Sequence, residues 1–313
     1  MPQIPAYLRI FSDFALTAVP FFMLTSFFLC EKQFEDTTGA SFEKRIFRLV
    51  LPFIVWNVVY FIIYSVVQHF TSVDLGVSFT SLRRQMFFGS VTELNPPMWF
   101  QFNLIILTIV FFVLYKHMNK KMLVSVLTIA LVLSYVIQYS SVYSKFFGQS
   151  SAEIKNSPGR LVMMLPFAIV GIFIAYAKPK IDANRKYWFY LGLLSVVSQI
   201  FILMVEQYDR PNCSQYGGIL LMFKALSVFI LAYTLPCWHF HPVVKKIIKS
   251  VASCSYGVYF LHFGIGFAMN AFLSSKGLEV NTFAECVVIF ILSYLICFLV
   301  SKLPIRYSKE LVG

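Results

Sequence analysis

The sequence predicts an all-α protein that crosses a membrane many times, and three observations carry that prediction. Of its 313 residues, 58% are hydrophobic and only 13% are charged, whereas a soluble chain has about 25% charged residues. The mean hydropathy is +0.74. The apolar residues form continuous runs close to the ~20 residues with which a helix crosses the hydrocarbon core. Strands of a membrane barrel would alternate over about ten residues, so these runs predict helices.

Nine apolar runs follow one another along the chain, and each predicts one membrane span. In order they are Phe11–Cys30, Leu49–Val67, Met98–Tyr115, Met122–Tyr139, Leu161–Ala177, Tyr187–Val205, Gly218–Trp238, Val251–Leu273 and Phe283–Val300. Pro20, Pro52 and Pro166 lie inside or near the ends of spans, where membrane helices tolerate proline. The gaps between the spans leave no room for a soluble domain, so residues 1–313 are expected to form a single transmembrane domain.

Lysine and arginine are unevenly distributed between the alternating loops. With the N-terminus outside, eight of them lie in outer segments and seventeen in inner segments. Together with Lys224, which lies within a span, these are the 26 Lys and Arg of the chain. Cytoplasmic loops carry the basic excess, so the N-terminus is predicted outside and the C-terminus in the cytoplasm. The same rule accounts for the net charge of +12, and no zinc-finger or RNA-binding pattern points to nucleic acid.

The sequence shows no metal-binding or disulfide pattern. Its six cysteines form no C-x-x-C motif and lie mostly in or beside apolar runs, at Cys30, Cys213, Cys237, Cys254, Cys286 and Cys297. They are therefore interpreted as small buried hydrophobic residues. His239 and His241 flank Pro242, and two histidines at this spacing do not make a metal site on their own. We expect no metal cofactor.

A basic cluster precedes the second span. Lys44, Arg45 and Arg48 lie at its cytoplasmic mouth, and the two arginines share one helix face because they are three residues apart. The guanidinium group presents a planar fork that matches phosphate oxygens. The cluster therefore predicts either a site for a phosphorylated cytoplasmic donor or an ordinary basic flank that extends to lipid headgroups.

Two further features place polar groups in apolar surroundings. His262 lies near the middle of the eighth span, one turn after Tyr259, and an ionisable group at that depth is a functional candidate. The alternative is a neutral histidine hydrogen-bonded between helices. Trp99 and Asn103 begin the third span and predict either an interfacial belt with cavity-facing amides or part of a site. Lys224 lies within a span, and we expect it either to pair with Glu206 or Asp209 or to face a cavity.

Five motifs in order resemble those of the membrane acyltransferase 3 family. The family pattern V-P-F-F-x-x-S-G-F-L-L is similar to residues 19–29, and K/R-R-x-x-R-x-x-x-P is similar to residues 44–52. The short pattern L-W-F is similar to residues 98–100. The last two patterns, R-L-x-x-x-L-P-F-x-x-x-G and S-Y-G-x-Y-L-x-H, are similar to residues 160–171 and 255–262. In the first motif the family's glycine is replaced by Ser26, which removes a residue suited to close helix packing. The resemblance extends over nearly the whole chain.

The resemblance implies a bacterial inner-membrane O-acyltransferase. Members of the family use a cytoplasmic acyl-CoA, such as acetyl-CoA, to modify a hydroxyl of an envelope polysaccharide or lipid-linked sugar. Lys44, Arg45 and Arg48 would bind the donor. His262 would be the catalytic candidate, supported by Ser26, Trp99, Asn103 and Tyr259. The alternatives are an inactive relative, or a transporter or flippase of a glycan precursor. A repeat between the two halves would favour a transporter, and none is evident.

The resemblance also carries an expectation about the start of the chain. Family members have ten spans, and the first bears an R…H pair whose histidine is the proposed catalytic residue. No such span fits before Phe11. Removing it from ten leaves nine spans with the N-terminus outside, which agrees with the loop charges. The sequence thus resembles a member that lacks the first helix, through a misplaced start or through degeneration.

Overall fold

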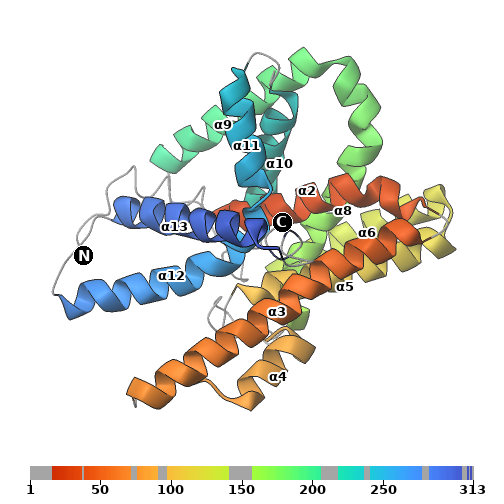
Figure 1. Ribbon diagram of the computed structural model, residues 1–313. Coiled ribbons are helices and arrows are strands. Elements are labelled where there is room, and N and C mark those ends of the chain that lie inside the picture. The colour runs from red at the N-terminus through yellow and green to blue at the C-terminus, as the bar shows by residue number, and fades with distance from the viewer. Residues whose placement is uncertain are drawn as a thin grey trace. The chain divides into compact units, whose positions relative to one another are not determined.

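The computed structural model describes residues 16–36, 39–71, 76–90, 97–140, 157–205, 218–235, 240–276 and 282–304, together with 309 and 311. All the regular structure in this part of the chain is helical (Figure 1). The eleven helices are α2 (Ala18–Phe34), α3 (Ala40–Thr71), α4 (Phe79–Phe88), α5 (Met98–His117), α6 (Lys120–Tyr139), α8 (Ser157–Ala183), α9 (Arg185–Val205), α10 (Ile219–Thr234), α11 (Pro242–Ala252), α12 (Ser255–Ser275) and α13 (Thr282–Lys302).

Six of the described helices are long and apolar enough to cross a membrane, namely α3, α5, α6, α8, α12 and α13. This confirms the prediction of an all-helical polytopic membrane protein. The other three predicted spans correspond to α2, α9 and α10, of which α10 has only 16 residues. The start of the first span, Trp238 at the end of the seventh, and both partners proposed for Lys224 lie outside the described residues. The total of nine spans and the orientation of the termini stay predictions.

The sequence analysis missed two short helices, and one predicted span begins in the wrong place. Helix α4 lies in the second loop, where Ser78 forms a capping box with Ser81 and the left-handed Gly89, at φ 57°, ends the helix. The eighth span was predicted to begin at Val251. That residue instead belongs to α11, because the backbone turns at Ser253 and Cys254 before α12 begins. An apolar run does not reveal such a turn, since both sides of it are apolar.

The helices group into two compact units, and α3 and α5 contribute to both. Unit 1 consists of Met1–Lys44 and Asn103–Leu235. In it α2 packs against α8 and α10, α6 against α8, and α9 against α10. Gln138 joins three of these helices: its amide nitrogen donates to the Val162 carbonyl, 2.9 Å away, and its oxygen accepts from Gly218 N at the start of α10.

Unit 2 consists of Arg45–Phe102 and Pro236–Gly313. It contains most of α3, the first turn of α5, and helices α4, α11, α12 and α13. Helices α12 and α13 pack against each other, with Cys254 and Cys297 buried between them beside Val258 and Tyr294. Their free thiols are buried, as expected, and so is that of Cys30. The expectation was wrong for Cys286, which is exposed, and Cys213 and Cys237 lie outside the described residues.

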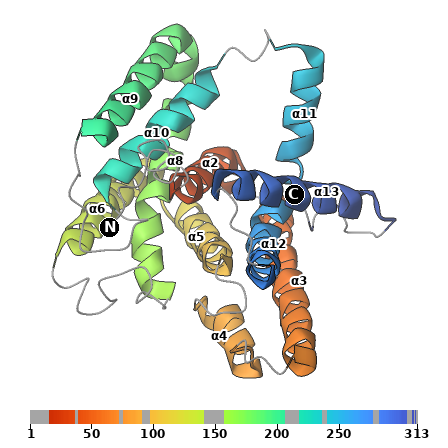
Figure 2. The same cartoon turned by 90° about the vertical axis from the view of Figure 1, so that its left-hand side faces the viewer.

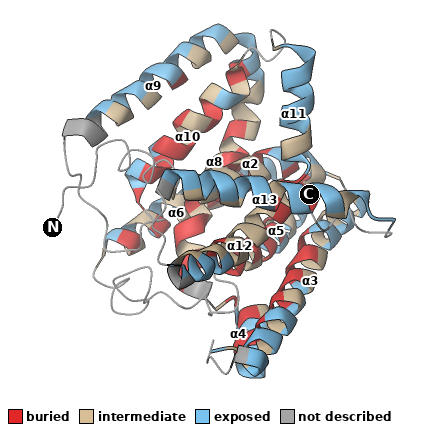
Figure 3. Cartoon of the chain, turned by 60° about the vertical axis from the view of Figure 1, so that its left-hand side comes forward, coloured by how far each residue is buried: buried red, intermediate tan, exposed pale blue. Residues whose placement is uncertain are grey.

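The outer surfaces of several helices are apolar and exposed (Figure 3). On α13, for example, Val288, Ile291 and Leu299 are all exposed. A helix that is hydrophobic all round must be buried in protein or lipid, so these surfaces face the bilayer. The exposed Thr128 hydroxyl bonds to a carbonyl four residues earlier in the same helix, which satisfies it in lipid.

Candidate active site

The basic cluster occupies the first turns of α3. Lys44 and Arg48 are exposed, and Arg45 between them is half-buried. Helical spacing places Arg48 three residues from Arg45 and four from Lys44, so all three side chains share one side of the helix. Lys44 is the last residue of unit 1 in this segment, and the two arginines open unit 2. The continuous helix nevertheless fixes the order of the three cations.

A buried amide supports α3 one turn beyond the arginines. Pro52 lies inside the helix and has no N–H to donate to the carbonyl of Arg48, which disturbs the backbone bonding at this turn. Gln101 on α5 is fully buried, and its amide nitrogen donates to the adjacent Leu49 carbonyl at 2.8 Å. The Gln101 side-chain oxygen has no hydrogen-bond partner among the described residues. A buried acceptor without a partner is costly, so this oxygen is available to a ligand donor.

Tyr256, near the start of α12, connects this turn of α3 to the family motif at 255–262. Its hydroxyl lies within electrostatic reach of Arg45 and beside the Gln101 side chain. Within unit 2, the Tyr256 phenol thus lies beside the buried Gln101 amide, with the half-buried Arg45 guanidinium within electrostatic reach. The guanidinium and the phenol can donate hydrogen bonds to an anionic or carbonyl oxygen, whereas the Gln101 side-chain oxygen can only accept one.

The histidine candidate lies six residues further along α12. His262 is half-buried, and its ring makes hydrogen bonds to the backbone of Val258 and Tyr259. A neutral imidazole has one donor and one acceptor nitrogen, so His262 can donate to a backbone carbonyl and still accept a proton. Six helical residues advance about 9 Å along the axis, which is the axial separation between Tyr256 and His262.

Tyr259 contacts His262 and connects it to other aromatic side chains. The two ring centroids are 5.7 Å apart, and the Tyr259 hydroxyl donates to the Pro97 carbonyl at 2.7 Å. Phe100 packs edge-on against Tyr259, at 5.5 Å between centroids, and edge-on against the buried Trp99 at 6.2 Å. Phe100 thus places the first turn of α5, which carries Trp99, beside Tyr259, and Tyr259 in turn contacts His262.

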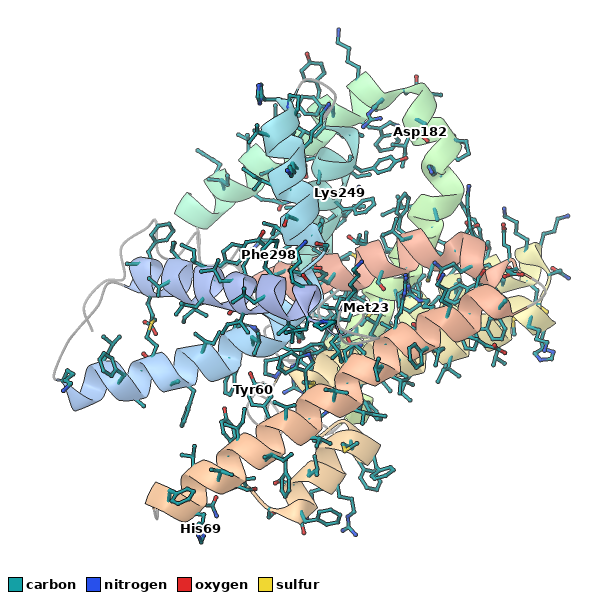
Figure 4. All side chains as sticks on the ribbon, in the orientation of Figure 1. Met23, Tyr60, His69, Asp182, Lys249 and Phe298 are labelled. Atoms are coloured by element: carbon teal, nitrogen blue, oxygen red, sulfur yellow. The ribbon has the colours of Figure 1, made fainter. Side chains whose placement is uncertain are left out.

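A tyrosine on α3 fixes the crossing with α12. The Tyr60 hydroxyl donates to the Phe260 carbonyl at 2.7 Å (Figure 4). A Cβ added at Gly264 would lie 2.5 Å from that hydroxyl, so the bond depends on a glycine at position 264. Trp56, one turn earlier on α3, lies near Phe260 and donates from its indole nitrogen to the Leu311 carbonyl. These contacts position the α12 segment that carries His262.

Ser26 and Asn103 are predicted site residues that belong to unit 1. Ser26 is half-buried on α2, and Asn103 is completely buried on α5. In the family motif, a glycine at the position of Ser26 would allow close helix packing. In this protein the glycine at the close contact belongs to the partner helix α8 instead. Gly171 of α8 lies so close to α2 that a Cβ on it would overlap the Leu24 carbonyl.

Sequence reasoning missed three of the groups that organise unit 2. Gln101 was not selected as a site residue, and Tyr256 was included only as part of a motif. Tyr60 was not singled out, because a tyrosine inside an apolar run is ordinary. The available signal was the α-helical spacing of Trp56, Tyr60 and Tyr64, which places them on one face. In the described part of the chain, no three His, Cys, Asp or Glu side chains gather as a metal site requires.

The comparison with known families agrees with the geometry. The chain matches the acyltransferase 3 family (Acyl_transf_3), described as an acyltransferase domain, over residues 2–302. The protein therefore belongs to this family and is a membrane acyltransferase by class. The match extends through both compact units. No curated protein and no solved structure matches the chain.

Proposed function

We propose that this protein is an O-acyltransferase. It would move an acyl group, with acetyl as the first candidate, from cytoplasmic acyl-CoA to a hydroxyl of an envelope polysaccharide or lipid-linked sugar in the bacterial inner membrane. The observation that supports this best is in unit 2. The Tyr256 hydroxyl lies beside the Gln101 side chain and within electrostatic reach of Arg45 at one end of the α12 motif, and His262 lies about 9 Å further along the same helix.

The donor would bind at the start of α3. Acyl-CoA carries several phosphate groups, and Lys44, Arg45 and Arg48 supply three cations on one side of a helix. Arg45 is the half-buried member of the set, so its charge is less screened by water than those of its exposed neighbours. The thioester end would then extend along α12 past Tyr256, whose hydroxyl can donate to a carbonyl oxygen.

His262 would act as the general base. Its acceptor nitrogen would take the proton of the acceptor hydroxyl while that oxygen attacks the thioester carbonyl carbon. The C–S bond then breaks, the new ester forms, and the imidazolium returns its proton to the departing CoA thiolate. Such a base contributes about 10²–10⁴-fold in rate. Tyr259 would be a positioning residue, because its contact with His262 and its bond to Pro97 fix the ring.

The experiment uses the full protein, expressed from its own gene and purified in detergent. Binding of acetyl-CoA is measured first, and then transfer of its labelled acetyl group to envelope glycan. Replacing both Arg45 and Arg48 with alanine should weaken acetyl-CoA binding by about 10–100-fold, since hydrogen bonds to charged groups contribute about 1.5–3 kcal/mol. The matched control replaces Arg83 and Arg84, an exposed arginine pair on α4, and should leave binding unchanged.

A second variant separates the base from the donor site. His262→Gln should lower kcat by about 10²–10⁴-fold and leave acetyl-CoA binding intact. Binding without transfer in the unsubstituted protein would indicate the inactive-relative alternative. The absence of acetyl-CoA binding would favour a glycan-precursor transporter or flippase and would refute the proposed donor site.

A further inference from the structure

Helix α11 (Pro242–Ala252) differs from every long helix of unit 2. Pro242 occupies its first turn and the His241 side chain caps it by accepting from Val243 N. Its sequence, PVVKKIIKSVA, contains three lysines and no acidic residue. At helical spacing the valines and isoleucines fall on one side and Lys245, Lys246 and Lys249 on the other. The helix is therefore amphipathic and purely basic.

The apolar side of α11 is not covered by the rest of the described chain. Val243, Val244, Ile247 and Ile248 are 43–57% exposed, and no residue of the helix is buried. Figure 3 shows this exposure along almost the whole helix. Four neighbouring exposed apolar side chains indicate a surface that another phase or partner covers. With 11 residues the helix is only about 16 Å long, which is too short to cross the ~30 Å hydrocarbon core.

The direction of α11 fits a helix that lies flat on a membrane. It runs across the direction of α12 and α13 in both Figure 1 and Figure 2. Only Ser253 and Cys254 separate it from α12, and Ser250 bonds to the Tyr294 hydroxyl of α13 at 2.7 Å. Because α12 has the length and hydropathy of a membrane span, a helix that crosses its starting residue lies near the plane of the interface.

The positive charge of α11 indicates that the surface it binds is an anionic membrane surface. Lys249, seen on this helix in Figure 4, is exposed together with Lys245 and Lys246. Amphipathic helices with a lysine-rich polar side bury their apolar side at the boundary between headgroups and acyl chains, and anionic lipids strengthen the binding. Long lysine stems also let the ammonium groups extend to the headgroup level. The loop charges predict that this segment is cytoplasmic, where the surface is negatively charged.

We propose that α11 is an interfacial anchor that binds the anionic phospholipid headgroups of the cytoplasmic leaflet through Lys245, Lys246 and Lys249. Its apolar side enters the lipid, and the anchor fixes the start of α12. Each lysine near an anionic surface contributes about a fivefold factor, so three contribute up to about 100-fold. This anchor is independent of the acyl-transfer chemistry, because its three lysines are distinct from Lys44, Arg45 and Arg48.

The test measures amide hydrogen exchange of residues 242–252 in the full protein, reconstituted in nanodiscs. One preparation contains phosphatidylcholine alone, and the other an equimolar mixture of phosphatidylcholine and phosphatidylglycerol. We expect exchange in α11 to be slower in the mixture by up to about 100-fold, and the difference to shrink as salt is added. A third preparation, phosphatidylcholine with inorganic phosphate, should behave like phosphatidylcholine alone.

The control variants distinguish charge from packing. Replacing Lys245, Lys246 and Lys249 with glutamine should abolish the difference between the two lipids. Replacing Lys178, Lys180 and Lys186, which lie in unit 1, removes the same charge and should preserve it. The proposal is overturned if α11 exchanges equally in both lipids, if phosphate alone protects it, or if the α11 variant keeps the lipid difference. Equal and fast hydrogen exchange of α11 in the two lipid preparations would instead indicate that an acidic protein partner covers its apolar side.

Discussion

The contact between α2 and α8 can be tested by adding a single methyl group at Gly171. An ideal Cβ there would overlap the Leu24 carbonyl oxygen and lie 3.1 Å from both Phe27 Cβ and Phe28 N. Two of these three atoms are backbone atoms of a helix, so they cannot move aside without shifting α2. Overpacking of this kind costs about 1–3 kcal/mol. The substitution G171A should therefore destabilise unit 1.

The size of the effect depends on a matched control. Alanine gains about 1 kcal/mol over glycine in a helix interior, and this gain also appears in G266A. At Gly266 the nearest atom to an added Cβ is Ile289 Cδ1, the end of a flexible side chain, at 3.2 Å. The control substitution should therefore be neutral or slightly stabilising. The difference between the two variants isolates the helix contact from helix propensity.

The assay is thermal unfolding in detergent, followed by a thiol-reactive dye. Cys30 on α2 is fully buried, and its thiol donates to the carbonyl of Phe27, which contacts Gly171. The thiol should therefore react with the dye when α2 separates from α8. We expect Tm to fall by about 2–10 °C in G171A relative to G266A. Equal Tm values, or a higher Tm in G171A, would refute the close approach of the two helices.

Two further predictions concern single side chains. Y60F removes the hydrogen bond to the Phe260 carbonyl and should lower the free energy of unfolding by about 1 kcal/mol. The matched control Y64F should lower it less, because the buried Tyr64 hydroxyl has no partner among the described residues. Equal losses of unfolding free energy in the two variants would contradict this prediction. Glu31 follows the first predicted span, and burial, followed by repulsion from Glu35, raises its pKa above the usual 4.5. The folded state therefore holds this proton more tightly than the unfolded state, so its contribution is fully present below pH 4.5 and is lost as pH rises through the folded pKa. E31Q should then raise Tm at neutral pH and leave it unchanged near pH 4, and a gain that persists in acid would contradict the cause.

Much of the candidate site could be predicted from the sequence. Arg45 was selected because a guanidinium fork matches phosphate oxygens, and His262 because an ionisable group within a span is costly. Tyr259 was selected because it lies one turn before His262. The structure places all three in unit 2. It could not be predicted that Gln101 would bond to the Leu49 carbonyl, because that bond joins residues 52 positions apart. Hydropathy measures each segment alone and contains no information on such pairings.

The missed helices have a similar explanation. Helices α4 and α11 have 10 and 11 residues, shorter than the run of about 20 that marks a membrane span. The cap residue Ser78 and the first-turn Pro242 were visible in the sequence, but they did not show which side of each short helix would be exposed. For α11 that question is decided by contacts with α12 and α13, which only the fold supplies.

The sequence by itself determined the class of this protein. Its apolar runs require a helical membrane protein, since backbone groups in lipid must be satisfied within each segment, and its ordered motifs indicate the acyltransferase family. Tertiary structure alone decided which residues meet: Arg45 with Tyr256, Tyr60 with the backbone at Phe260, and Gly171 with α2. The physical reason is the distance over which each interaction acts. The transfer of a segment into lipid depends on its own composition, whereas hydrogen bonds and close packing act over a few ångströms between residues far apart in the chain.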